Sequence, residues 1–528
     1  MATAVNLHRF VTVHSLPAQT RTTRPRRYLR LRSQKKETSS LETTVDEPVS
    51  PALPPKPVPP LASSTSALIA NLRELFKFDE LGRDIISIAL PAALALAADP
   101  ITALVDTAFV GHIGSAELAA VGVSVSVFNL VSKLVNVPLL NVTTSFVAEE
   151  QVLASKSTDV ASECQDRKVL PSVSTSLALA AGVGIAEAVA LYVGSGFLMN
   201  IMGIPVDSPM REPAKQFLSV RAFGAPPIVV ALAAQGAFRG FKDTRTPLYA
   251  VVAGNLLNAI LDPVLIFQFG FGIGGAAVST VISEYLIAFI LLWKLNDKVE
   301  LISPEIDGAR FLRYLNSGGL LIGRTIAVLL TMTLSTSLAA KEGSISMAGH
   351  QICMQVWLSV SLLNDALALA GQALLANGYT EGNYKQARKV IYRTLQIGLF
   401  TGVVLAVVLS VGFGAFSSLF TSDTDVLKIA WSGIWFVAGS QPMNALAFVI
   451  DGLYYGVSDF GYAAYSMIIV GVISSAFLLI ATPVYGLAGV WAGLFLFMTL
   501  RVTAGIWRLG TRSGPWEMVW AETEQEND

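Results

Sequence analysis

The feature that most constrains the fold is a series of apolar runs, each of 20 or more residues, that begins at residue 84. A helix of about 20 apolar residues crosses the hydrocarbon core of a bilayer. Twelve such runs, separated by short polar breaks, predict an all-α polytopic membrane protein with twelve transmembrane helices. The expected spans cover residues 84–109, 117–147, 169–200, 211–238, 246–268, 272–295, 309–340, 346–376, 388–420, 426–455, 460–483 and 486–510.

Composition supports a membrane protein and excludes several other classes. Of the 528 residues 53% are hydrophobic and only 14% are charged, whereas a soluble domain has about 25% charged residues. Two cysteines, Cys164 and Cys353, exclude a disulfide scaffold and a four-cysteine zinc site. The four histidines match no metal-ligand spacing, and no motif of a membrane-embedded enzyme is present. We therefore expect no catalytic residues, no metal and no cofactor.

The first 75 residues differ from the rest of the chain. Residues 1–36 contain nine Lys or Arg, seven Ser or Thr and no acid, which is typical of an organelle transit peptide. A disordered basic tail is the alternative. Residues 48–66 are proline-rich and predict an extended linker. The sequence thus predicts an organelle membrane protein, in a plastid membrane such as the envelope or alternatively in the mitochondrial inner membrane.

Basic residues indicate the topology. The breaks after expected spans 2, 4, 6 and 8 hold fourteen Lys or Arg, and the breaks after odd-numbered spans hold four. The positive-inside rule places both termini on the basic side, which in an organelle is the stroma or matrix.

The chain also repeats itself. Residues 235–249 resemble residues 451–465, and residues 114–123 resemble residues 344–353. Three pairs of residues coincide in the first match: Gly236 with Gly452, Gly240 with Gly456, and Asp243 with Asp459. Because each half holds six spans, an even number, the halves are related by a pseudo-twofold axis along the membrane normal. We expect six-helix lobes at residues 80–300 and 301–512, followed by a polar tail at 513–528.

Together these motifs resemble the multidrug and toxic compound extrusion (MATE) transporters. The resemblance is carried by Pro91, VDTAFVGHIGSAELAAVG (105–122), FRGFKDTRTPLY (238–249), GNLLNAILDPVLI (254–266) and the glycine-rich GIGGAAVSTVIS of span 6. With its transit-like N-terminus the chain is similar to a plant, plastid-envelope member of the DETOXIFICATION group, which lies near the citrate-exporting MATE proteins.

The resemblance implies a cation-coupling site in the N-terminal half. In the family it consists of an Asp in span 1, an Asn and an Asp four apart in span 5, and a Thr in span 6. The matching residues are Asp106, Asn258, Asp262 and Thr280. Asn258 and Asp262 share a helix face because they are four apart, and a carboxylate pair in a low dielectric can hold a proton. With the amide and hydroxyl oxygens it could instead hold Na⁺, so H⁺ and Na⁺ both remain as coupling ions.

Prolines near these acids are candidate hinges. Pro91, Pro100 and Pro263 each remove a helical hydrogen bond. In the family a bend of span 1 near a proline is proposed to follow protonation, and Pro91 matches that position. A static kink is the alternative.

Buried charges outside the coupling site are candidates for a substrate cavity. Asp99 shares a face with Asp106, while Arg221 and Arg324 lie within spans 4 and 7. Either arginine could pair with Asp99, Glu187, Glu284 or Asp365, or bind a substrate carboxylate. Span 7 has Arg324 and no acid, where many cation-exporting relatives have a Glu. This departure puts an acidic centre in the C-terminal half in doubt and favours an anionic substrate.

The predicted function is secondary active efflux by alternating access, in which H⁺ or Na⁺ is exchanged for an organic anion such as citrate. Export of other metabolites, organic cations or xenobiotics remains open, as does a lipid-head-group flippase of related fold. The expected partners are the lipid bilayer and a small-molecule substrate, with no nucleic acid, and we expect the protein to act as a monomer.

Overall fold

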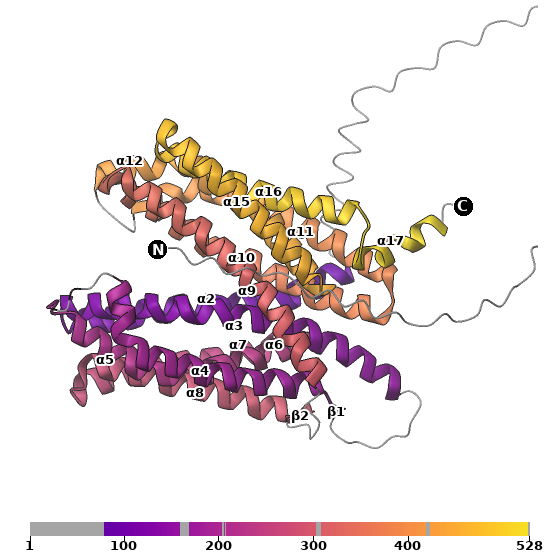
Figure 1. Ribbon diagram of the computed structural model, residues 1–528, viewed down its shortest axis with the longest axis horizontal. Coiled ribbons are helices and arrows are strands. Elements are labelled where there is room, and N and C mark those ends of the chain that lie inside the picture. The colour runs from indigo at the N-terminus through magenta and orange to yellow at the C-terminus, as the bar shows by residue number, and fades with distance from the viewer. Residues whose placement is uncertain are drawn as a thin grey trace, which may run out of the picture. The chain divides into compact units, whose positions relative to one another are not determined.

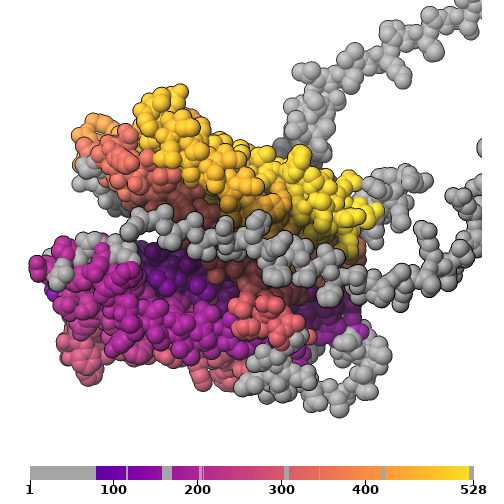
Figure 2. All heavy atoms as spheres, in the orientation of Figure 1, coloured from indigo at the N-terminus to yellow at the C-terminus, as the bar shows by residue number. Residues whose placement is uncertain are grey.

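A computed structural model describes residues 79–158, 168–202, 205, 207–301, 308–418 and 423–525. The predicted transit peptide and the proline-rich linker lie outside these residues. The described chain is helical, apart from two short strands, β1 (Lys168–Val169) and β2 (Val299–Glu300), that pair in parallel. Figure 1 shows the helices of the two halves as two bundles, indigo to pink and orange to yellow. Figure 2 shows the same division in the packed atoms.

The helices reproduce the expected spans. The first half contains α2 (Glu80–Gly111), α3 (Ser115–Thr158), α4 (Pro171–Ile201), α5 (Arg211–Arg221), α6 (Ala225–Gly240), α7 (Arg245–Pro263) and α8 (Gly272–Asn296). The second half contains α9 (Gly308–Lys341), α10 (Ser344–Glu381), α11 (Tyr384–Ser418), α12 (Thr424–Ser432), α13 (Ile434–Val437), α14 (Gln441–Gly456), α15 (Phe460–Tyr485), α16 (Leu487–Gly510) and α17 (Pro515–Gln525). Within the described ranges, eleven stretches are long and apolar enough to cross a membrane, and a bent pair brings the number to twelve.

Spans 4 and 10 are broken, although the sequence predicts them as single helices. A 3₁₀ turn, Ala222–Gly224, separates α5 from α6. In the second half, α12 and the segment Ile434–Gly456 meet at Gly433 with a bend of 42°. The breaks fall in corresponding spans, which supports the internal repeat. Pro226 lies in the first turn of α6, directly after the first break, and Pro442 lies in the first turn of α14, after the short α13. At such a position a missing N–H costs nothing.

The two halves pack their helices in the same way. In the first, α6 packs on α3 and α4, and in the second, α14 packs on α10 and α11. The repeated glycines make this packing possible. A Cβ at Gly236 would come within 2.8 Å of the carbonyl oxygen of Leu140 on α3, and a Cβ at Gly452 would overlap that of Ala368 on α10.

The repeated aspartates also have the same role in each half. Asp243 accepts a hydrogen bond from Lys298 at 2.7 Å, just beyond the end of α8. Asp459 accepts one from Arg508 at 2.9 Å, near the end of α16. Each aspartate therefore ties the loop before the fifth span of its half to the end of the sixth.

Polar contacts between the halves gather at one end of the bundle. Gln372 of α10 donates to the Asn141 carbonyl and to the Ser145 hydroxyl of α3, both at 3.0 Å, and Ser145 donates to the Tyr455 carbonyl at 2.7 Å. Arg313 of α9 pairs with Glu149 of α3 at 2.8 Å. These residues lie toward the C-terminal ends of α3, α10 and α14 and the N-terminal end of α9, which is the basic side of the sequence.

The C-terminal segment differs from the polar tail that the sequence suggested. Residues Pro515–Gln525 form α17, whose Trp516 and Val519 are fully buried. The Trp516 indole donates to Asp459 at 3.1 Å. The tail is therefore a short amphipathic helix, held by two apolar anchors and by the same aspartate that binds Arg508.

Candidate functional site

The four residues predicted to hold the coupling cation come together from three helices. Asp106 lies on α2, Asn258 and Asp262 lie one turn apart on α7, and Thr280 lies near the start of α8. Asn258 and Asp262 are 1% and 0% exposed. The carboxyl groups of Asp106 and Asp262 lie close enough to share a hydrogen bond. The packing of α7 between α2 and α8 thus builds one site from residues 174 positions apart, the span from 106 to 280.

A serine that the sequence analysis missed completes this site. The Ser279 hydroxyl donates to Asp262, and the Asn258 amide donates to Ser279 and to Thr280, both at 3.4 Å. Thr280 itself donates to the Ala276 carbonyl at 2.8 Å. Thr280 therefore supports Asn258, while Ser279 contacts the carboxylate directly. The signal was present in the sequence, because Ser279 adjoins Thr280 in the glycine-rich entry of span 6.

Three acceptor oxygens in the site have no hydrogen-bond partner within the described part of the chain. They are Asp106 Oδ1, Asn258 Oδ1 and Asp262 Oδ2, one from each of three predicted ligands. A buried acceptor without a partner costs about 1–3 kcal/mol. Such oxygens fit a positively charged ligand: a hard metal ion could be ligated by all three, whereas a proton would join the two carboxylate oxygens.

The backbone changes at Pro263, directly after Asp262. The α-helix ends there, and Val264–Gln268 continue as a π-helical turn. The turn packs against Gly275 of α8, where a Cβ would come within 2.8 Å of the Leu265 carbonyl oxygen. The glycine-rich entry to α8 therefore lets this turn approach closely. Pro91 and Pro100, the other predicted hinges, lie inside α2, which continues past both as one helix.

Asp99 lies on α2, the helix that also carries Asp106. It lies near Asn255 and within electrostatic reach of Arg221 and Lys133. The side chains of Asp99 and Lys133 are exposed although both lie in membrane-spanning helices. Charged side chains at this depth face a water-filled cavity or the bundle interior rather than lipid.

The structure assigns carboxylate partners to both arginines considered for substrate binding. Arg221 pairs with Glu284 of α8 and stacks on Phe128 at 4.7 Å. Glu284 is one of the four acids that the sequence suggested. Arg324 pairs with Asp451 of α14, an acid that the sequence analysis did not consider. Both guanidinium groups therefore already have a carboxylate counter-charge.

Arg324 belongs to a charged cluster in the second half. Asp451 accepts hydrogen bonds from both Arg324 and Arg501. Asp365 of α10 is exposed and lies within electrostatic reach of Arg239 and Arg324. Span 7 has no acid, and spans 8 and 10 supply the two acids, Asp365 and Asp451, that lie near Arg324. Asp451 stands where the first half has Gln235, so the repeat alone gave no reason to expect a charge.

Comparisons with known proteins agree with the architecture and the motifs. The MatE family model matches residues 91–264 and 321–480. The chain is 72% identical to "Protein DETOXIFICATION 44, chloroplastic" of Arabidopsis thaliana over 84% of its length and 85% of the relative. It is 51% identical to "Protein DETOXIFICATION 45, chloroplastic" of the same organism, over 83% of this chain and 80% of the relative.

Among solved structures, a MATE protein crystallised in the bent conformation superposes with a TM-score of 0.74 at 19% identity, covering 85% of this chain and 98% of the other. At that identity the likeness shows the fold alone, which is the two-lobe fold of MATE transporters. The family model and the plant relatives go further, because they match the sequence itself along most of its length. The chain therefore belongs to the MATE family of multi-pass membrane transporters.

Proposed function

We propose that the protein is a secondary active antiporter that takes up a cation at Asp106 and Asp262 and releases an organic solute by alternating access. One observation carries this proposal: two carboxylates from different helices meet at a buried point, where three acceptor oxygens lack partners. Two adjacent carboxyl groups in a low dielectric cannot easily both be charged, so the pair favours uptake of a cation.

The geometry favours a proton as the coupling ion. Hard metal ions collect about six or more oxygens, and the site offers three free acceptors within the described chain. The hydroxyl groups of Ser279 and Thr280 are already engaged with Asn258. A proton needs only the two carboxylates, and Ser279 and Asn258 hold Asp262 in place for it.

The substrate that the charges favour is an organic anion such as citrate. Three arginines, Arg239, Arg324 and Arg501, surround the two acids Asp365 and Asp451 in one electrostatic cluster. With three arginines and two acids, this cluster has a net charge of +1. Around Asp262, by contrast, acidic side chains outnumber basic ones. A carboxylate substrate would compete with Asp451 for the Arg324 guanidinium, which offers a planar fork for carboxylates.

The two chloroplastic relatives and the basic, hydroxyl-rich N-terminus support a plastid membrane, with the envelope as the proposed place. The basic ends of the helices would face the stroma. We propose a monomer as the working unit, because one chain supplies all the residues of both charged clusters.

Proton flux in proteoliposomes tests the coupling site. Asp262→Asn should lower substrate-dependent proton flux at least tenfold, because the amide cannot accept the transferred proton, and Asp106→Asn should act in the same direction. Asp207→Asn, at an exposed loop position, is the matched control and should leave flux unchanged. Normal coupling in Asp262→Asn would contradict the proposal.

Substrate class needs a separate experiment. Uptake of labelled citrate and of a cationic dye should be compared in wild type, Arg324→Ala and the exposed-site control Arg245→Ala. Loss of citrate transport in Arg324→Ala alone supports the anion proposal. Unchanged citrate flux in that variant removes the role of Arg324, and transport of the dye without citrate would assign the protein to organic cations.

A further inference from the structure

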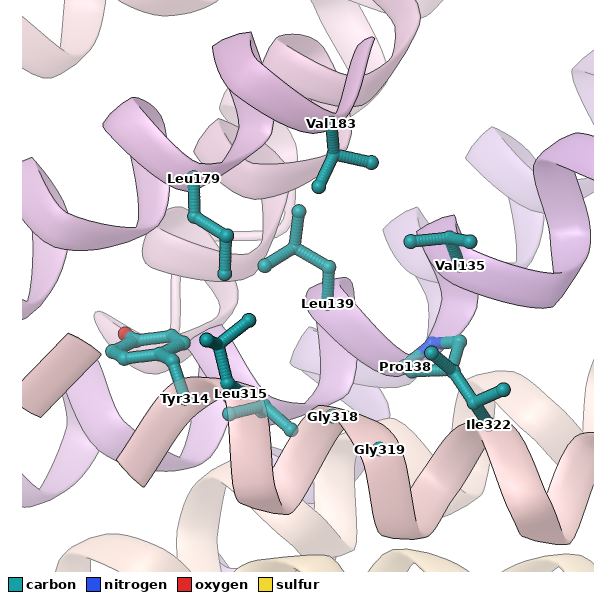
Figure 3. Close-up of a pocket in the computed structure, with 11 residues that line it drawn as sticks. Val135, Pro138, Leu139, Leu179, Val183, Tyr314, Leu315, Gly318, Gly319 and Ile322 are labelled. Carbon is teal, nitrogen blue, oxygen red and sulfur yellow. The ribbon is translucent and has the colours of Figure 1, made fainter. Parts of the chain in front are cut away.

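A groove runs along the seam where α9 of the second half meets α3 and α4 of the first (Figure 3). It holds a cavity of about 110 Å³. The lining is apolar apart from one tyrosine hydroxyl: Val135, Pro138, Leu139, Val142, Leu179, Val183, Tyr314, Leu315, Gly318, Gly319 and Ile322. The groove lies away from the cation site and contains none of its residues.

Two glycines keep the groove open. A Cβ built on Gly318 or Gly319 would meet nothing within 4 Å. The repeated glycines behave differently, because a Cβ there would strike the neighbouring helix. Gly318 and Gly319 therefore serve no contact between helices, and they leave the surface of α9 free for something else to lie against it.

Two aromatic rings, those of Tyr314 and Phe146, stand at the basic end of the groove, and charged side chains lie beyond them. Tyr314 is buried, donates to the Ser172 carbonyl at 3.1 Å and meets Phe146 edge to face at 4.8 Å. Beyond these rings a second pocket shares Tyr314 and contains two ion pairs, Arg313 with Glu149 and Arg310 with Glu150.

The charged mouth is ordered and still accessible. The Arg313 guanidinium stacks on Phe146 at 4.2 Å while it pairs with Glu149. The side chains of Arg313 and Arg310 remain 51% and 42% exposed. The four charges sum to zero, with two of each sign, and they lie at the basic ends of helices whose middle parts cross the membrane.

We propose that this groove binds a zwitterionic glycerophospholipid, with one acyl chain against Gly318 and Gly319 and the head group at the charged mouth. From Tyr314 to Ile322 the groove follows α9 for about 12 Å at 1.5 Å per residue, which suits a stretch of acyl chain. The phosphate contacts Arg313 and Arg310, and the ammonium contacts Glu149 and Glu150. A head group with a single charge would contact either the arginines or the glutamates of the mouth, but not both. An uncharged head group would pair with neither.

The bound lipid would touch both halves of the protein at once. Its chain lies between α3 and α4 on one side and α9 on the other, so it fills space at the seam where the halves meet. The proposal does not depend on what the protein transports, because it rests on the groove and its mouth alone.

Photo-crosslinking of the full-length protein in nanodiscs tests the site. Phosphatidylcholine carrying a diazirine in one acyl chain should label the stretches 135–142 and 314–322 at least fivefold more than the exposed stretch around Leu330 of α9. Gly319→Leu, which fills the groove, should lower this labelling at least threefold. Leu330→Trp, at a residue that is 65% exposed on the same helix, should leave it unchanged.

A competition experiment tests recognition of the head group. Unlabelled phosphatidylcholine should compete for the groove several-fold better than phosphatidylglycerol or diacylglycerol, and the double variant Glu149→Gln with Arg313→Gln should abolish that preference. The melting temperatures of wild type and of each variant are measured first. Addition of phosphatidylcholine should raise the melting temperature of wild type but not of Gly319→Leu. Even labelling along α9, no effect of Gly319→Leu, or equal competition by diacylglycerol would overturn the proposal.

Discussion

At the scale of single residues, the protein buries charge only where other groups stabilise it. A carboxylate at the bilayer centre costs at least about 2.5–3.5 kcal/mol on insertion scales. Asp262 receives a hydrogen bond from Ser279 and lies against Asp106, and the proposed cation would offset this cost. Asp451 instead pairs with two guanidinium groups. Under the proposed function the first acid exchanges a cation, whereas the second already has its counter-charges.

This difference predicts unequal effects of substitutions in the second half. Asp451→Ala leaves two buried arginines without their shared counter-charge and should destabilise the fold by about 3–5 kcal/mol. Arg324→Met leaves Asp451 paired with Arg501 and should cost clearly less. Thermal unfolding of the purified variants in detergent measures both. Equal losses would mean that Asp451 does not serve both arginines.

The loop aspartate Asp243 gives a prediction about pH. Burial tends to raise its pKa, but hydrogen bonds from Lys298 and Thr246 outweigh burial and hold the pKa of Asp243 below its usual value. A carboxyl group with a lowered folded pKa contributes stability above its unfolded pKa, which is near 3.8, and loses it as pH falls through the folded value.

Wild type should therefore lose stability below about pH 4 through this group. Asp243→Asn should already be less stable at pH 7, by about 1.5–3 kcal/mol, because it loses hydrogen bonds to a charged group. The variant should also lack the part of the stability loss at low pH that protonation of Asp243 causes. Melting temperatures measured from pH 7 to pH 3 provide the check, and parallel curves for the two proteins would contradict it.

At the scale of the helices, close packing depends on small residues at repeated positions. Gly236 and Gly452 bring α6 onto α3 and α14 onto α10, where any Cβ meets a backbone carbonyl. Sequence matching found these glycines, because they recur in the two halves. It did not show what they contact, since their partners lie about 100 residues earlier in the chain.

Gly452→Ala and Gly236→Ala should each destabilise the protein by about 1–3 kcal/mol, because backbone carbonyls cannot move aside as side chains can. Gly461→Ala, on α15, is the matched control: its Cβ would meet nothing within 4 Å, so stability should stay the same or rise slightly. Thermal unfolding of the three variants in detergent measures these effects. A loss in Gly461→Ala as large as in the others would show that helix propensity, and not packing, is measured.

The sequence predicted where the spans lie but not where they break. Apolar length is a local property, so eleven long helices and a bent pair match the expected runs. The breaks at Ala222–Gly224 and at Gly433 are marked only by nearby glycines and by Pro226 and Pro442. Within an apolar run such residues equally indicate a packing or kink position, because neighbouring helices decide whether they end a helix.

At the scale of the whole transmembrane unit, the halves are joined by polar contacts at their basic ends. Gln372, Ser145 and the pair Arg313–Glu149 cross the seam there. In the proposed alternating-access cycle these contacts would break when the basic side opens. Their strength would then set how often that side opens.

A charge swap tests this role. Arg313→Glu places two carboxylates together across α3 and α9 and should open the basic side, raising maleimide labelling of a cysteine introduced at Gln372 several-fold. Adding Glu149→Arg restores an ion pair in reverse and should return labelling toward that of the parent. If the double variant labels as fast as Arg313→Glu alone, the pair does not hold the seam. Native Cys353 is buried, and a variant lacking both cysteines provides the background.

The sequence by itself determined the twelve spans and the internal repeat, which follow from apolar length and from matching segments, both local in the chain. Its resemblance to the MATE family named four residues that the structure brings together at the proposed cation site. Only the tertiary structure decided which buried charges pair, that Ser279 contacts Asp262, and which end of the bundle joins the halves. Ion pairs and hydrogen bonds of this kind join residues far apart in the chain, such as Ser145 and Tyr455, which are 310 positions apart. No local pattern specifies them, because each charge has several possible partners until the helices are packed.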